Sequence, residues 1–293
     1  MRFRAVSAVV CSLLLTISAV PSSAEERPFE VPTTNPRTTL VQRVAATEFE
    51  LSYQRPRVKG REIFGALVPW GEVWRTGADS ATRIAFDTPI EMEGQRIPAG
   101  EYELFTIPDP AEWTVIIHQR QNQWGAYSYD PANDVARLRV RPIRLSEPVE
   151  SFRIGFDRVG NSTAVLQIDW DRTRVPVRIA IDVEETVVPE LERMLIEAER
   201  KPYFLAAMFY YENGLDIDRA AELIGLAVEA APDHIGILHR QALILAEQGD
   251  VDGAIAAAKR SLDGAESAPP PLRDEYVRLN TALLERLEGP ASD

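Results

Sequence analysis

The sequence is poor in the residues that carry thiol and imidazole chemistry. It has one cysteine, Cys11, and three histidines among 293 residues. A single cysteine excludes a disulfide within the chain, and the histidines lack the ligand spacing of a zinc site. We therefore expect no metal and no cofactor, and a fold that ordinary hydrophobic cores stabilise.

Basic residues are also scarce relative to acidic ones. The chain has 32 Lys and Arg against 45 Asp and Glu, which gives a formal net charge of −13. The excess is largest in residues 186–293, which hold 10 basic and 20 acidic side chains. Such a surface repels phosphate backbones and anionic headgroups, so we expect neither nucleic acid nor a membrane surface as a partner.

Long apolar runs are absent except at the N-terminus. Basic residues in positions 1–4 precede an uncharged stretch over 5–20, and small residues suited to a signal peptidase follow. This is the layout of a secretory signal, whereas a membrane anchor needs about 20 apolar residues. We predict a signal peptide over residues 1–24, cleaved after Ala24. The mature chain is then cysteine-free, exported to the periplasm or the medium, and without membrane insertion.

Period-two alternation dominates the next part of the chain. β-branched and aromatic residues alternate with polar ones in short runs that Gly, Pro, Asn and Asp separate, as in antiparallel sheets. The predicted strands are residues 47–53, 82–86, 101–107, 113–118, 136–145, 151–157, 163–170 and 175–183. They predict a β-sandwich or barrel over residues 46–185, after a leader or linker over residues 25–45.

The hydrophobic period then changes to that of helices. A predicted linking helix, residues 186–200, precedes a pattern of large and small residues that recurs at a spacing of 34. The two copies are Phe204, Ala207, Tyr211, Ala220, Ala227, Pro232 and Leu238, Gln241, Leu245, Ala254, Ser261, Glu266. The spacing resembles the tetratricopeptide repeat. We predict two such repeats with a capping helix over residues 201–290; a generic bundle of helical hairpins is the alternative.

These patterns together predict an α+β multidomain protein. An antiparallel all-β sandwich or barrel is followed by an all-α, tetratricopeptide-like helical repeat region.

The segment from Arg55 to Thr82 is denser in special residues than a sandwich requires. It contains two tryptophans, five basic residues and four glycines. Glycine permits tight turns, tryptophan supplies flat apolar area with one donor, and arginine offers a planar fork of donors. This composition suits either a packed polar network or a ligand site.

Rare residues in and after this segment occur in an order that resembles a known family. The matching runs are Ser52-Tyr53, Arg55-Pro56, Lys59-Gly60-Arg61, Ile63-Phe64-Gly65, Val68-Pro69-Trp70-Gly71, Trp74-Arg75-Thr76-Gly77-Ala78, Ala81-Thr82, Pro98-Ala99-Gly100-Glu101-Tyr102, Ile107-Pro108, Trp113 and Trp124-Gly125-Ala126-Tyr127. They are similar to the signature of the bacterial "domain of unknown function 2911" family over about residues 40–185. The resemblance implies an exported β domain, in some members with helical repeats behind it. It implies no activity, ligand or catalytic residue.

Two interpretations of the motif region remain open. In the structural one, Trp70 and Trp74 cap the sandwich core, and Arg75 pairs with Asp79 or with loop carbonyls. In the functional one, aromatic faces with charged edges line a pocket for a small polar or carbohydrate-like ligand. The candidate ligand-binding residues are Trp70, Trp74, Arg75, Asp79, His118, Trp124, Tyr127 and Tyr129.

His118 is the histidine best placed for chemistry. It ends a predicted strand close to Tyr and Asp residues, as a general base often does. A Ser80–His118–Asp triad lacks a nucleophile-elbow motif, and we do not favour it. The weak catalytic candidates are Arg75, Asp79 and His118.

Two functions from different classes follow. The first is an exported binding or scaffolding module, with a small-ligand site in the β domain and a protein partner docked by the helical repeats. The expected docking residues are Phe204, Met208, Tyr211 and His239. The second is an extracytoplasmic hydrolase or isomerase, which requires the three catalytic candidates to converge in one cleft. We favour binding, because no acid–base pair occurs at a recognisable spacing.

Overall fold

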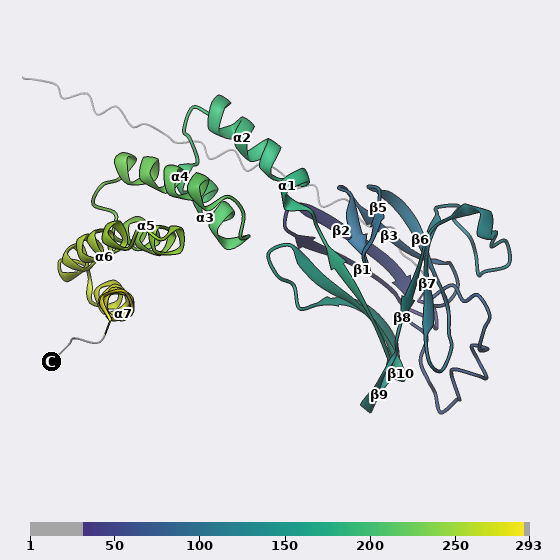
Figure 1. Cartoon of the computed structure of the whole chain (residues 1–293). Coiled ribbons are helices and arrows are strands. Elements are labelled where there is room, and N and C mark those ends of the chain that lie inside the picture. The colour runs from purple at the N-terminus through teal and green to yellow at the C-terminus, as the bar shows by residue number, and fades with distance from the viewer. Residues whose placement is uncertain (1–31, 290–293) are drawn as a thin grey trace, which may run out of the picture. The chain divides into compact units, whose positions relative to one another are not determined.

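The computed structural model describes residues 32–289 of the chain (Figure 1). They form a β region with ten strands followed by a helical region with seven α-helices. The antiparallel all-β part followed by an all-α part is the α+β organisation that the periodicity predicts. The predicted signal peptide, its cleavage site and Cys11 lie outside the described residues.

The larger sheet has six antiparallel strands in the order β1-β2-β3-β6-β7-β8. These strands are β1 (Arg37–Val44), β2 (Thr47–Gln54), β3 (Thr82–Phe86), β6 (Gly100–Ile107), β7 (Trp113–Gln119) and β8 (Asp134–Val140). A short 3-10 helix, η1 (Pro131–Asn133), precedes β8. The long connection from β2 to β3, residues 55–81, carries most of the motif that the sequence singles out.

The smaller sheet has four antiparallel strands in the order β5-β4-β10-β9. These strands are β4 (Ile90–Met92), β5 (Gln95–Ile97), β9 (Ile143–Asp157) and β10 (Thr163–Ala180). The pairing of β9 with β10 shifts register between Asp169 and Thr173, which marks a β-bulge around Asp171. The described strands form two separate sheets, so this region is a sandwich and not a closed barrel.

One hydrophobic core lies between the two sheets. Phe49 and Leu51 of β2 are fully buried, while the residues that precede each of them, Glu48 and Glu50, are exposed. This is the alternation expected of a strand with one covered face. Residues of β10 such as Leu166 meet them from the smaller sheet. Burying one such side chain completely contributes about 1.5–3 kcal/mol.

The other face of the larger sheet is covered in part by loops. Phe105 of β6 and Ile116 of β7 are fully buried in a second, smaller cluster with Ala81 of the β2–β3 connection. Because both of their faces are covered, β6 and β7 have nearly continuous runs of buried residues, which in β6 include Glu103.

The observed strands differ from the predicted ones in four ways. β1 lies within residues 25–45, which we expected to be a leader, and its outward side chains, such as the 61% exposed Val41, hide the alternation. β4 and β5 have three residues each, too few to give a pattern. The predicted strand over 136–145 divides at Arg141-Pro142 into β8 and β9. The last two predicted strands are one, β10, because the bulge bends it without ending it.

The helical region begins directly after β10. Its helices are α1 (Val183–Thr186), α2 (Val188–Glu197), α3 (Tyr203–Glu212), α4 (Ile217–Ala230), α5 (Ile235–Gln248), α6 (Val251–Glu266) and α7 (Pro270–Glu288). Asp216 and Asp250 cap α4 and α6, each accepting a backbone N–H at 3.0 Å. Gly249 ends α5 in the left-handed conformation, with φ of 93°.

Helices α3 and α4 pack as one pair, and α5 and α6 as the next. Ala220 of α4 and Ala254 of α6, which are 34 residues apart, are both fully buried. Small side chains here let the helices approach closely enough to bury their aliphatic faces. Tetratricopeptide repeats and a generic bundle of hairpins both contain such pairs.

A buried polar chain joins α7 to α5 and α6. Ser261 occupies the position of Ala227 in the first copy, and its Oγ donates to the carbonyl of Ile235 at 2.8 Å. Asn280 of α7 donates from Nδ2 to this Oγ at 2.9 Å, and its Oδ1 lies 2.8 Å from His239 Nδ1. The departure from the repeat pattern at Ser261 is thus explained by hydrogen bonding to the last helix.

None of the helices within residues 32–289 combines the length and the apolar character needed to cross a membrane.

Candidate functional site

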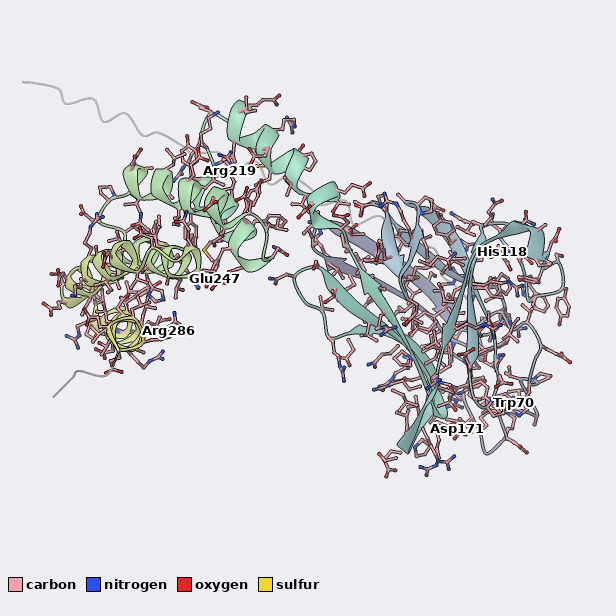
Figure 2. All side chains as sticks on the ribbon, viewed as in Figure 1. Trp70, His118, Asp171, Arg219, Glu247 and Arg286 are labelled. Atoms are coloured by element: carbon pink, nitrogen blue, oxygen red, sulfur yellow. The ribbon has the colours of Figure 1, made fainter. Side chains whose placement is uncertain are left out.

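The β region has a groove of about 460 Å³, here named the Trp70 groove. Figure 2 labels two of its residues, Trp70 and Asp171, at the same end of the β region. Aromatic side chains form its floor and charged side chains its rim. The floor comprises Phe64, Trp70 and Trp113, and the rim comprises Glu62, Asp109, Arg144, Asp171, Arg172 and Thr173.

The floor is the outer layer of a larger aromatic cluster. Phe64 lies between the other two floor residues, with ring centroids 6.0 Å from Trp70 and 4.9 Å from Trp113. Behind it, Trp74 and Trp170 stack at 5.7 Å with an interplanar angle of 16°. Trp113 is almost fully buried, whereas Trp70 is 41% exposed. The groove therefore presents one accessible indole against a fixed aromatic wall.

A tight turn positions Trp70. The amide of Val68 donates to the carbonyl of Ile63 at 2.8 Å, and that of Gly65 to the carbonyl of Val68 at 2.8 Å. Gly65 has φ of +94°, and a Cβ there would lie 2.4 Å from Trp70 Nε1. Only glycine fits under the indole in this conformation, which explains the Ile-Phe-Gly…Pro-Trp-Gly pattern physically.

The bulge in β10 supplies part of the rim. Asp171 has φ of +49°, an uncommon conformation for a non-glycine residue that Asp tolerates better than most. Across the hairpin, Thr173 is paired with Arg144, which places both at the rim. Asp109 is held by its own turn, because its Oδ1 accepts from the amides of Ala111 and Glu112 at 2.8 and 3.2 Å.

Two indole nitrogens of the aromatic cluster lack an acceptor. Nε1 of Trp113 and Nε1 of Trp170 are buried without a hydrogen-bond partner among the described residues. Buried donors are paired in the large majority of cases. Trp113 lines the groove, so one of these donors belongs to a groove residue.

Trp74 lies behind the groove and not in it. Its ring is in the sandwich core, and its Nε1 donates to the carbonyl of Gly77 at 3.1 Å. Its backbone exchanges hydrogen bonds with Thr106 of β6 at 2.7 and 2.9 Å. Trp74 therefore occupies the edge of β6 that β3 leaves uncovered, in agreement with its structural interpretation.

The residues after Trp74 form a closed loop. The amide of Thr82 donates to the carbonyl of Arg75 at 3.2 Å, and Thr82 Oγ1 donates to the carbonyl of Thr76 at 2.6 Å. Arg75 and Asp79 form no ion pair with each other in the structure described. Asp79 Oδ2 accepts from Asn35 Nδ2 at 3.3 Å, and Arg75 Nε is buried without a partner within residues 32–289.

His118 of β7 is fully buried, with its ring edge to face against Phe105 of the second, smaller cluster. Its Nδ1 lies 2.9 Å from Asp134 Oδ1, and its Nε2 lies 3.1 Å from Gln123 Nε2. An amide nitrogen can only donate, so in this arrangement Nε2 accepts and Nδ1 carries the proton. Both ring nitrogens are engaged, which leaves none for a substrate.

Tyr129 belongs to the same polar network. Its hydroxyl donates to Asp134 Oδ2 at 2.7 Å and accepts from Arg137 Nη2 at 2.7 Å. Burial, followed by the hydrogen bond to Asp134, raises the pKa of Tyr129 to about 12. The phenol is thus neutral and serves to fix the loop.

Trp124 and Tyr127 lie on the surface. They are 65% and 81% exposed, and their rings stack at 6.0 Å with an interplanar angle of 20°. The loop that carries them is fixed by backbone hydrogen bonds from Ala81 to Gln123 and from Gly125 to Asp79, at 3.0 and 2.9 Å. Ser80 forms an isolated β-bridge with Trp124. The hydrogen bonds of the His118 ring described above go to Asp134 and Gln123, and not to Ser80.

The predicted docking residues divide into two kinds. Phe204 and Tyr211 of α3 are half-buried. Met208 of α3 is buried, and His239 of α5 is buried with its Nδ1 bonded to Asn280.

Within residues 32–289, no group of three or more His, Cys, Asp or Glu side chains is arranged to hold a metal ion.

Of the eight predicted ligand-binding residues, the structure places Trp70 in the groove. Sequence reasoning singled out Trp70 without its neighbours Phe64 and Trp113, although both stand in the runs that carry the family resemblance. The sequence did not indicate the rim residues Arg144 and Asp171. A β-bulge brings Asp171 to the rim, and cross-strand pairing with Thr173 brings Arg144 there.

Comparison with known proteins agrees with the resemblance noted in the sequence. The family model described as "Protein of unknown function (DUF2911)" matches residues 35–179, which begin just before β1 and end within β10. No curated protein matches the chain.

Proposed function

Because residues 35–179 of this chain belong to the family of proteins of unknown function DUF2911, we propose a function from the geometry of the β region. In this proposal, the β region is a binding module that holds a small carbohydrate-like ligand in the Trp70 groove. The observation that carries the proposal is an aromatic floor with one accessible indole, surrounded by carboxylates and guanidinium groups.

The shape and the lining of the groove both suit a sugar ring. A groove of about 460 Å³ is within the range of about 300–1,000 Å³ found for small-molecule sites. The apolar face of a pyranose stacks on an indole, and its hydroxyls bond to charged side chains at the edge. Trp70 supplies the ring, and Glu62, Asp109 and Arg144 supply polar groups at the rim.

We favour binding over hydrolysis or isomerisation. The alternative enzyme needs Arg75, Asp79 and His118 to meet at one accessible point. His118 is fully buried with both nitrogens bonded, and Asp79 is bonded to Asn35. The groove does not include any of the three.

For the helical region we propose protein docking, by tetratricopeptide-like repeats with α7 as the cap. The buried alanines at a spacing of 34 support repeat pairing. Phe204 and Tyr211 are the two predicted docking residues with exposed surface. With the predicted signal peptide, this gives an exported module of the cell envelope, in the periplasm or secreted.

Calorimetric titration with a panel of neutral oligosaccharides tests the groove. We expect binding that Trp70→Ala weakens about tenfold, since a stacked ring contributes about 0.5–1.5 kcal/mol beyond its buried area. Trp124→Ala is the matched control, because it removes another exposed indole outside the groove. Equal loss in both variants, or none in Trp70→Ala, would reject the groove as the site.

A further inference from the structure

A second groove, of about 500 Å³, adjoins the Trp70 groove. Ile143 at the start of β9 lines both of them. We name the second one the arginine groove, after its five arginines. They are Arg139, Arg141, Arg158, Arg174 and Arg178.

The arginine groove is locally basic on an acidic chain. Its five arginines face three acidic residues, Glu93, Glu112 and Asp157, for a local net charge of +2. The whole chain has a formal net charge of −13. The average charge, from which we expected anions to be repelled, therefore does not describe this surface.

Three of the arginines are engaged with carboxylates. Arg174 bonds to the buried Asp169 at 2.7 Å, and Arg178 bonds to Glu93 at 2.6 Å. Arg139 lies 3.5 Å from Glu112, with both side chains largely exposed. Contacts of this exposed kind contribute little, so the Arg139 charge is only weakly compensated.

The remaining two arginines carry uncompensated charge. Arg141 and Arg158 are exposed and form no ion pair within residues 32–289. Arg141 follows the last residue of β8, whose alternation puts Arg137 and Arg139 opposite the buried Leu138 and Val140. Arg158 has φ of +48° in the turn between β9 and β10.

The rest of the lining is apolar except for Gln167, whose Nε2 donates to Asp157 Oδ2 at 2.6 Å. Val140, Val165 and Pro176 lie among the arginines. An extended ligand with an apolar face and acidic groups along one edge matches this surface, because guanidinium forks fit carboxylate geometry.

We propose that the two grooves together bind an acidic oligosaccharide. One sugar ring stacks on Trp70, and carboxylates of the neighbouring sugars are held by Arg141 and Arg158. This rests on the proposed sugar site and adds the ligand class, a glycan containing uronic acids. Ile143 lines both grooves, so they adjoin at the start of β9.

Matched oligosaccharides test the proposal. A tetramer of glucose and a tetramer of galacturonic acid are titrated calorimetrically against the full chain at low salt and at 0.5 M NaCl. We expect the acidic tetramer to bind about tenfold more tightly at low salt, and the preference to shrink at high salt, where the Debye length falls to a few Å.

The double variant Arg141→Gln/Arg158→Gln separates the two proposals. It should weaken binding of the acidic tetramer about fivefold, because two exposed charge pairs are lost and each contributes modestly. Binding of the neutral tetramer should not change. Arg278→Gln is the control for loss of positive charge outside the groove, since Arg278 is exposed on α7. It should leave binding of the acidic tetramer nearly unchanged.

The outcomes distinguish the inference from the proposed function. If both tetramers bind equally and Trp70→Ala weakens both, the acidic ligand is wrong and the sugar site stands. If neither tetramer binds, both proposals are overturned. An acidic preference that survives in the double variant also overturns the role of the two arginines.

Discussion

Gly65 and Trp70 constrain each other at the residue scale. The indole lies so close to Gly65 that any Cβ would overlap it, 2.4 Å from Nε1. The exposed indole is therefore fixed by a backbone position and not by neighbours packed on its outer side. Pre-positioning of this kind reduces the entropy that a ligand must overcome.

This leads to a prediction for Gly65→Ala. The new methyl group should displace the indole of Trp70, in addition to straining a backbone with φ of +94°. We expect saccharide affinity to fall as far as in Trp70→Ala, with stability lower by about 1 kcal/mol from the backbone strain. Calorimetric titration and thermal unfolding measure the two effects.

Gly71→Ala is the matched control for Gly65→Ala. Gly71 also has a positive φ, +77°, but a Cβ there meets no atom within 4 Å. It should show the loss of stability without the loss of affinity. Unchanged affinity in Gly65→Ala would contradict the proposed link between this glycine and the indole.

Individual site residues were only partly predictable from the sequence. Trp70 stands out because tryptophan is rare and here lies in a turn-prone Pro69-Trp70-Gly71 run. Asp171 and Arg144 do not, because a register shift in the β9–β10 hairpin decides where they point. The aromatic and charged residue types predict one pocket for Trp124, Tyr127 and His118, but Trp124 and Tyr127 are on the surface and His118 is fully buried.

At the scale of elements, one buried polar side chain of α7 bonds to both α5 and α6. Asn280 is fully buried and bonds to Ser261 Oγ, to the carbonyl of Tyr276 and to His239 Nδ1. Leu283 and Leu284 add apolar contact with α6. The polar contacts specify the register of α7, and the leucines supply the hydrophobic burial.

We predict that Asn280→Ala destabilises the helical region by about 1–3 kcal/mol, because it leaves buried partners unpaired. Helical ellipticity during urea unfolding measures this. Glu285→Ala, an exposed change on the same helix, is the control and should be nearly neutral. Equal stabilities of the two variants would show that the polar chain does not anchor α7.

Strands were predictable where one face is buried and the other is exposed. β2 and β3 alternate between buried and exposed residues, and their predicted bounds are within one residue of those observed. β1 fails this criterion because its outward residues include Val41 and Leu40 is only partly buried. The bulge in β10 also has no signature in residue type alone.

At the scale of the whole molecule, two buried titratable groups give the two regions different responses to pH. Burial, opposed by the hydrogen bond to Asn280, lowers the pKa of His239 below its ordinary value of 6.5. Its neutral form is thus the native one. The associated stability is complete above pH 6.5 and declines as pH falls from there towards the pKa of the folded state.

In the β region, the buried group is Asp169, and its contribution to stability changes in a lower pH range than that of His239. Burial alone would raise the pKa of Asp169, but hydrogen bonds from Arg174 and Arg153 outweigh it and lower the pKa below 3.8. The ionised form is native, so this contribution is complete above pH 3.8 and lost only as pH falls through the pKa of the folded state. At pH 5.5 it is intact.

We therefore predict that acidification from pH 7.5 to 5.5 lowers the unfolding temperature of the helical region more than that of the β region. All five tryptophans lie between residues 70 and 170, so their fluorescence reports on the β region alone, while ellipticity at 222 nm is dominated by the helices. Thermal scans with both signals should separate at the lower pH. In His239→Gln, which cannot be protonated, the ellipticity transition should lose this part of its pH dependence. A transition that still moves as far as in the parent chain would assign the effect to other groups.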